Sequence, residues 1–163
     1  MTRPRTVLLC ALLALLGGGC GVRPTGVTDG GPPPSGIPQG MRIYFASDSG
    51  PRGVSRPGVR IDQLDDVFKL LLSGPTAEER ASGLSNVVDG DGQFHATSRH
   101  GRVTLTTTGY LGSPQYPGTA QLVCTLARAE VVLHGTRPDK VQVTVVGRDG
   151  RAGPYQCQQF LQR

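Results

Sequence analysis

The sequence predicts an α+β domain in which a small, mainly antiparallel sheet carries helices on one face. Short segments in which apolar and polar residues alternate, as they do in strands, recur along residues 41–146. Segments with apolar residues at helical spacing lie between them. The elements follow the order β-α-α-β-β-α-β, and this order predicts a two-layer sandwich.

The first predicted strand is Met41 to Ala46, where Ile43 and Phe45 alternate with polar neighbours. Residues 47–59 are rich in glycine and proline and are predicted to form a loop. A helix is then expected to begin at Asp62, whose carboxylate can cap the free amides of the first turn. The buried stripe of this helix consists of Leu64, Val67, Phe68 and Leu71.

A glycine and a proline, Gly74 and Pro75, are expected to end this helix. Thr76 and Glu79 follow at the spacing of a capping box, in which each side chain accepts a hydrogen bond from the backbone of the other residue. A second, short helix is therefore predicted over residues 77–82.

The second half of the domain is predicted to supply three strands and a long helix. Residues 93–98 and 102–107 alternate and flank a His-Gly turn, so they are expected to form an antiparallel hairpin. The long helix is expected over residues 119–134, and the last strand over residues 140–146.

Cys124 lies on the face of the long helix opposite its main apolar stripe, so another segment must cover that face. The expected cover is the C-terminal tail, with Tyr155, Cys157, Phe160 and Leu161. In an oxidising compartment an even pair of cysteines favours a disulfide between Cys124 and Cys157. Closing the loop between them would stabilise the fold by about 3–4 kcal/mol in the chain-entropy model. Two buried free thiols are the alternative.

The first twenty residues have the pattern of a bacterial lipoprotein signal. Two arginines precede an apolar run from Val7 to Leu16, which is too short to cross a bilayer because a span needs about 20 residues. Three glycines and Cys20 follow, so residues 1–19 resemble a signal peptide that ends at a lipobox. A lipobox usually has an aliphatic residue where this chain has Gly17.

Lipidation of Cys20 would hold the mature chain on the outer face of the cell membrane. The thiolate can take a diacylglyceryl group, and an amide-linked chain such as palmitate can follow on the new N-terminus; two or more chains anchor a protein stably. Residues 20–40 are rich in glycine and proline and predict a flexible tether, and residues 41–163 form the domain. The alternatives are an ordinary signal peptide with a chance cysteine and an uncleaved anchor.

The sequence contains no pattern typical of an enzyme or of a metal site. The G-x-S-x-G pattern fails after Ser85, and His95, His100 and His134 lack a ligand partner at i+4. The acidic turn at residues 89–92 lacks the glutamate that a calcium loop needs. We therefore expect no metal, no cofactor and no catalytic activity. A net charge of +5 without a basic run does not indicate a nucleic-acid partner.

One stretch of the domain, Leu70 to Val88, carries a specific motif: a leucine-rich helix end, Gly-Pro, a short acidic helix, and Gly-Leu-Ser before an apolar turn. The motif is formed by Leu71, Leu72, Gly74, Pro75, Glu78, Glu79, Gly83, Leu84 and Ser85. It resembles the signature of the GerMN domain of bacterial sporulation and spore-germination lipoproteins and of related envelope lipoproteins. The order of strands and helices extends the resemblance over most of residues 41–146.

This resemblance implies a non-enzymatic α+β module that serves in assemblies of the cell envelope. It carries over no binding residue. We therefore expect a membrane-anchored, extracytoplasmic lipoprotein whose domain binds an envelope protein or a cell-wall polymer, in sporulation or another envelope process. An envelope hydrolase and an accessory regulator of a nearby sensor or transport system are the alternatives.

Overall fold

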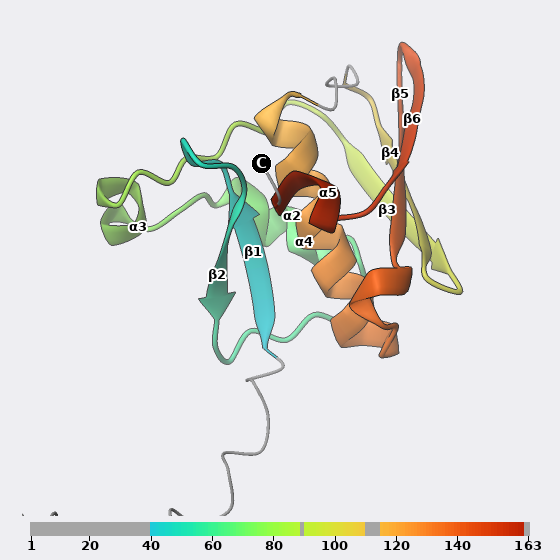
Figure 1. Cartoon of the computed structure of the whole chain (residues 1–163), viewed down its shortest axis with the longest axis horizontal. Helices are drawn as coiled ribbons and strands as arrows, with labels where there is room; N and C mark the ends of the chain where they lie inside the picture. The colour runs from blue at the N-terminus through green and yellow to red at the C-terminus, as the bar shows by residue number, and fades with distance from the viewer. Residues whose placement is uncertain (1–39, 89, 110–114, 162–163) are drawn as a thin grey trace, which may run out of the picture. The chain divides into compact units, whose positions relative to one another are not determined.

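The start of the domain is a hairpin, and not a strand followed by a loop. In this computed structural model, which describes residues 40–88, 90–109 and 115–161, β1 (Met41–Phe45) pairs antiparallel with β2 (Arg52–Arg56) (Figure 1). The prediction of a loop over residues 47–59 is therefore wrong at β2. Gly53 of β2 lies under the ring of Tyr44, since an added Cβ would be 2.9 Å from its Cε1 atom. Such a strand lacks the alternating apolar side chains that would reveal it.

The two short helices follow the predicted pattern, except at the start of the first. Helix α2 (Asp66–Leu72) begins later than predicted, and Asp62 does not cap it. The carboxylate of Asp66 instead accepts the backbone N–H groups of Asp62 and Gln63, at 3.0 and 3.1 Å. The predicted stripe is confirmed, because Leu64, Val67, Phe68 and Leu71 are buried. Helix α3 (Ala77–Ala81) begins with the predicted capping box.

A four-stranded sheet forms the other half of the domain, in the order β3-β4-β5-β6. Its strands are β3 (Phe94–Arg99), β4 (Arg102–Thr107), β5 (Gln142–Gly147) and β6 (Gly150–Tyr155). The predicted hairpin of β3 and β4 is confirmed, while β4 and β5 run parallel. Strand β6 was not predicted, because its glycines and proline give no strand pattern; only its last residue, Tyr155, belongs to the predicted covering tail. Proline is tolerated at such a sheet edge.

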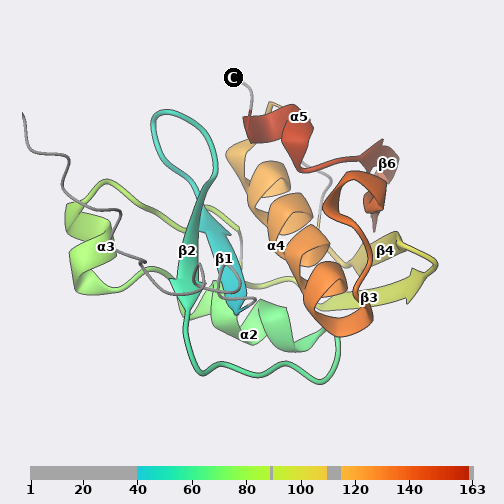
Figure 2. The same cartoon turned by 60° about the horizontal axis from the view of Figure 1, so that its bottom comes forward.

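Helix α4 (Pro117–His134) lies between the hairpin of β1 and β2 and the four-stranded sheet (Figure 2). The α+β class, with helices packed against mainly antiparallel strands, is confirmed. The strands form two sheets instead of the single sheet predicted. The physical reason is that α4 has apolar side chains on opposite faces, such as Leu126 and Cys124, and both are buried.

The C-terminal tail covers α4 near Cys124, as predicted. Short helix α5 (Gln158–Leu161) follows β6, and its Phe160 is 4% exposed. Leu161 does not share in this cover, because it is 49% exposed. The Sγ atoms of Cys124 and Cys157 are bonded at 2.02 Å. All described residues belong to one compact unit, and none of their helices is long and apolar enough to cross a membrane.

The edge of β1 that faces away from β2 is occupied by side chains of α4. The hydroxyl of Thr125 accepts the N–H of Tyr44 at 3.0 Å, and the amide of Gln121 donates to the carbonyl of Tyr44 at 3.2 Å. Both α4 side chains are fully buried. An open strand edge invites pairing with other chains. Polar side chains of the helix therefore replace a third strand in this small sheet.

Candidate functional site

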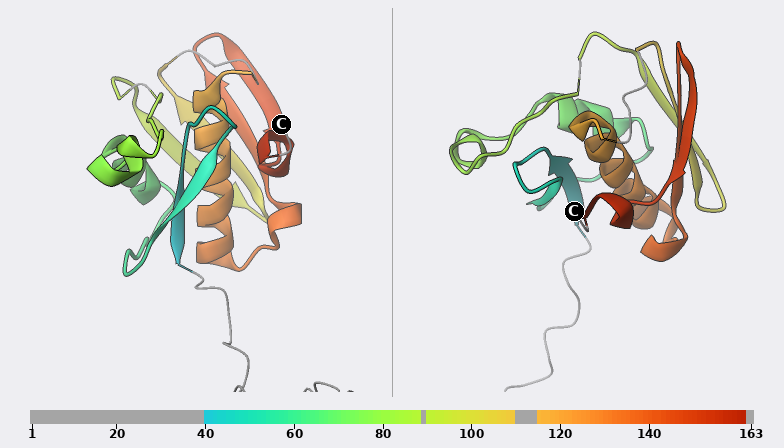
Figure 3. Two further views of the ribbon diagram at one scale, coloured as in Figure 1. Left: turned by 60° about the vertical axis from the view of Figure 1, so that its left-hand side comes forward. Right: turned by 45° about the horizontal axis from the view of Figure 1, so that its top comes forward.

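The most prominent feature outside the core is a projecting arm, which we define as residues 73–85. It follows α2 in the chain, and its last residue pairs with Ala46, directly after β1. Figures 1 and 3 show α3 of this arm standing away from both sheets. No residue of α3 is buried. Core residues lie at both ends of the arm, since Leu71 is 1% and Leu84 3% exposed. The arm is therefore a loop with a helix at its tip, fixed at both ends in the core.

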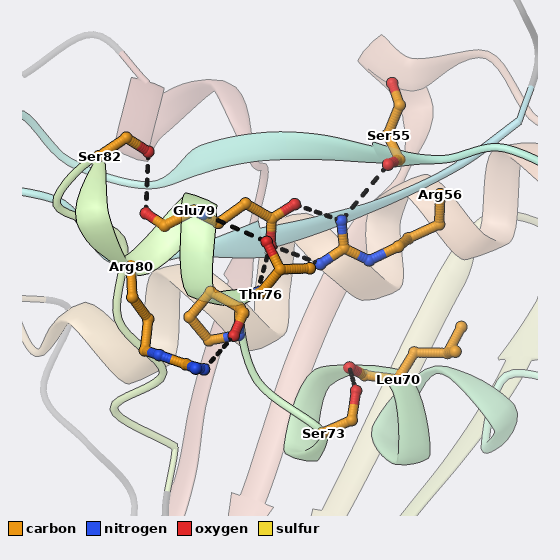
Figure 4. A network of polar contacts seen from close by, with 9 residues as sticks. Ser55, Arg56, Leu70, Ser73, Thr76, Glu79, Arg80 and Ser82 are labelled. Carbon is orange, nitrogen blue, oxygen red and sulfur yellow. Dashed lines mark hydrogen bonds and ion pairs between the residues drawn. The ribbon is translucent and has the colours of Figure 1, made fainter.

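An ion pair fixes the tip of the projecting arm to the hairpin (Figure 4). Arg56 of β2 donates to both carboxylate oxygens of Glu79, with Nη1–Oε1 and Nη2–Oε2 distances of 2.5 and 2.8 Å. Glu79 also accepts the N–H of Thr76 at 2.9 Å, and Thr76 accepts the N–H of Glu79 at 3.2 Å. The guanidinium lies 5.7 Å from the centroid of the Phe45 ring. One carboxylate thus caps the helix and fastens it to the body.

The charges of this pair are stable at neutral pH. The hydrogen bond from Arg56 lowers the pKa of Glu79, against the smaller opposing effect of burial. The same hydrogen bond raises the pKa of Arg56. Both side chains are 19% exposed, so solvent only partly screens them. A fork-to-fork contact of this kind restricts geometry as well as adding energy. The pair is suited to holding a position, and it offers no group for proton transfer near pH 7.

A second set of contacts fixes the base of the projecting arm. Ala46 and Ser85 exchange two backbone hydrogen bonds, of 2.9 and 3.0 Å. The buried side chain of Gln121 accepts the N–H of Val87 at 2.9 Å and donates to Asn86 at 3.2 Å. Because Gln121 also binds β1, one side chain of α4 joins the hairpin to the chain leaving the arm.

A cavity of about 300 Å³ lies beside the turn of the hairpin and the start of α4. Its walls include Ser47, Asp48, Tyr116 and Phe160. Among the described residues that line it, Asp48 has the one charged side chain, and none is a histidine or a cysteine. The cavity has space for a small polar molecule. Among these described residues, no nucleophile is paired with a base in the way that covalent catalysis uses.

None of the three histidines is among the residues that line this cavity. His95 Nδ1 lies 2.8 Å from Asp65 Oδ2, but the imidazole is 67% exposed on the open sheet. Asp65, the residue before α2, also accepts the N–H of Ala96 at 2.7 Å, so it ties the edge strand β3 to the start of α2. His134 lies 2.7 Å from Glu130. Across the described ranges, no three His, Cys, Asp or Glu side chains form a group that could hold a metal.

The structure describes some of the predicted site residues and leaves others outside its range. Cys20, the predicted signal peptide and the tether up to residue 39 lie outside the described residues. Cys124 and Cys157 are joined. Within the motif, Leu71 and Leu84 are core residues, and Gly74 and Gly83 have positive φ angles of 75° and 84°, which glycine adopts without strain. The motif is therefore the sequence of the projecting arm and its two ends.

Sequence reasoning missed Arg56 and Gln121, the two residues that hold the arm. Arg56 lies 23 residues before Glu79, in a segment predicted to be a loop. Gln121 belongs to a predicted helix, but nothing in the helical period shows that its amide faces two other segments. No local signal could have identified either partner.

Comparison of the chain with protein-family models, with curated proteins and with solved structures gives no match.

Proposed function

We propose that this chain is a lipid-anchored, extracytoplasmic module that binds a protein of the cell envelope through its projecting arm and catalyses no reaction. The observation that carries the proposal is α3, a helix without a buried residue that is nevertheless held in one place by the Arg56–Glu79 pair.

The energetics of the arm support a binding role. Fixing the backbone costs about 1–2 kcal/mol per residue, and burial of apolar surface normally offsets this cost. At α3 such burial is lacking, and the capping box and the ion pair order the helix instead. A surface that is ordered before binding loses less entropy when a partner arrives. The contacts to Arg56 thus prepare a surface without contributing to the core.

The proposed location rests on the sequence pattern around Cys20 and on the resemblance of the arm to the GerMN motif. A disulfide between Cys124 and Cys157 is compatible with the oxidising space outside the membrane. The partner we favour is an envelope protein, because α3 is a convex protrusion that suits a complementary protein surface. A role in sporulation remains part of the proposal through the resemblance alone.

Fractionation of cells tests the anchor. The wild-type protein should be in the membrane fraction and should carry the mass of the lipid on Cys20. The Cys20→Ala variant should lose that mass, and its signal peptide should remain uncleaved. A variant with unchanged mass and processing would contradict lipidation at this residue.

Two exposed positions of α3 test the binding surface. Glu78→Arg and Ala81→Arg should each lower the recovery of the partner on the anchored protein by about tenfold, the effect of roughly 1.4 kcal/mol at an interface. The matched controls are Asp62→Arg and Thr106→Arg, which make the same charge changes at exposed positions away from α3. All four variants should keep the wild-type melting temperature. Equal losses in the arm variants and the controls would refute the role of the arm.

A further inference from the structure

Two basic segments far apart in the sequence meet at one end of the domain. The turn between β3 and β4 is buried against the segment that follows α4, because a Cβ on Gly101 would lie 2.9 Å from Cγ2 of Thr136 and 3.3 Å from the carbonyl of Lys140. The carbonyl of Gly101 also accepts the N–H of Gln142 at 2.9 Å. The turn carries Arg99 and Arg102, and the segment with the 3-10 helix η1 (Pro138–Lys140) carries Arg137 and Lys140. We call these four cationic residues the basic end.

The cations of the basic end are exposed and poorly neutralised. Arg137 is 76% and Lys140 68% exposed, and the two share one carboxylate, Asp139, at 3.0 and 3.6 Å. Arg99 and Arg102 are exposed and lie directly opposite each other in the ladder. Neither takes part in an ion pair with another described residue.

Folding alone gives no reason for this arrangement. Like charges directly opposite each other across two strands destabilise a hairpin. The carboxylate of Glu130, which binds Thr136 beside this turn, is buried and already engaged with His134 and Thr136. An anion from outside the chain would relieve the repulsion between Arg99 and Arg102.

The basic end lies where the chain enters the domain. Arg128 of α4 donates to the carbonyl of Gly40, the residue before β1, with Nη2 and Nε at 2.8 and 3.2 Å. Glu130, two residues further along α4, accepts the hydroxyl of Thr136 at 2.9 Å. Figures 1 and 3 show the start of β1, η1 and the turn between β3 and β4 at one end of the domain, with the turn between β5 and β6 at the other.

We propose that the basic end docks onto the anionic phospholipid headgroups of the membrane to which the chain is anchored. The inference rests on the proposed lipid anchor, because a chain attached through Cys20 enters the domain at this end. Guanidinium groups bind phosphate oxygens through paired hydrogen bonds. Their attraction to an anionic surface falls off within about 10 Å at 0.1 M salt, so the tether must bring the domain close. Docking holds the domain in one orientation on the membrane.

Vesicle binding of the whole mature chain, residues 20–163 with Cys20→Ser, tests the docking without the lipid. The chain should sediment with vesicles of phosphatidylglycerol and phosphatidylcholine, should remain in solution with phosphatidylcholine alone, and should dissociate as salt is added. The double variant Arg99→Gln, Arg102→Gln should lower the partition coefficient roughly 30-fold, since each basic residue near an anionic surface contributes a factor of about 5.

The matched control is Arg52→Gln, Arg148→Gln, which removes the same charge at exposed positions near the opposite end. It should change the partition coefficient less than about threefold. Equal losses in the two double variants, or no binding to the anionic vesicles, would overturn the proposal. Binding to soluble poly(glycerol phosphate) but not to vesicles would overturn it in favour of a wall polymer. These results depend neither on lipidation of Cys20 nor on α3, so they can fail while the proposed function stands.

Discussion

Replacing Glu130 by glutamine would remove a buried charge while keeping the shape of the side chain. The carboxylate is 1% exposed and accepts hydrogen bonds from His134 at 2.7 Å and Thr136 at 2.9 Å. Ser98 of β3 is a further hydrogen-bond partner. Glu130 therefore joins the end of α4, the segment after it and the sheet. Glutamine would offer one accepting oxygen and would turn an NH2 group toward donors.

The magnitude follows from the hydrogen bonds that are lost or weakened. A hydrogen bond to a charged group contributes about 1.5–3 kcal/mol, and an unpaired buried donor costs about 1–3 kcal/mol. We expect Glu130→Gln to lower the free energy of unfolding by about 2–4 kcal/mol at pH 7. In a domain of this size each kcal/mol shifts the melting temperature by about 4 °C, so Tm should fall by roughly 8–16 °C.

The pH dependence separates the charge of Glu130 from its shape. Burial raises the pKa of Glu130, but the hydrogen bonds from Ser98, His134 and Thr136 outweigh it, so the folded-state pKa lies below the ordinary value of 4.5. A carboxyl with a lowered pKa stabilises the fold above its unfolded-state value, and this contribution is lost as the pH falls through the folded-state value. The stability difference between wild type and Glu130→Gln should therefore be full above pH 4.5 and should shrink below it.

Urea unfolding followed by circular dichroism, at several pH values from neutral to acidic, measures this difference. The control is Glu78→Gln, at an exposed carboxylate of α3, which should change the free energy of unfolding by less than about 0.5 kcal/mol. A pH-independent difference would show that glutamine disturbs packing and that the charge is unimportant. A difference below about 1 kcal/mol at neutral pH would refute the network as a source of stability.

Two further predictions concern α4. Cys157→Ser should lower the free energy of unfolding by about 3–4 kcal/mol, because the cross-link to Cys124 no longer restricts the unfolded chain. Reduction of the wild-type protein should reproduce this loss, and a reductant should leave the stability of the variant unchanged. Gln121→Leu should lower the free energy of unfolding by about 2–5 kcal/mol, since the N–H of Val87 and the carbonyl of Tyr44 each lose a hydrogen-bond partner in the interior. Amide hydrogen exchange at Val87 should become faster, and unchanged protection there would contradict the role of Gln121.

Local patterns in the sequence predicted the elements whose stability is decided within a few residues. The stripe of α2, the capping box of Thr76 and Glu79, and the hairpin of β3 and β4 all depend on neighbours within one or two turns of chain. The need to cover the face of α4 that carries Cys124 could also be predicted, because a helix with apolar residues on opposite faces must be enclosed.

Other features depend on which segments meet in three dimensions. Strands β2 and β6 carry glycines, arginines and a proline, so their pairing comes from backbone hydrogen bonds to strands that were already predicted. The division into two sheets follows from the position of α4 between them. A strand without alternating apolar side chains has no signal of its own.

The order and spacing of nearby residues are enough to predict the α+β class, the capping box and the motif of the projecting arm. They also predict the anchor at Cys20, which stays a prediction. Other features become visible only in the folded chain: Arg56 holds the arm and Gln121 joins three segments. Four basic residues also meet at the end where the chain enters the domain, namely Arg99, Arg102, Arg137 and Lys140. These contacts could not be predicted from the sequence, because hydrogen bonds and charges act through space. They join residues whose separation along the chain follows no regular period.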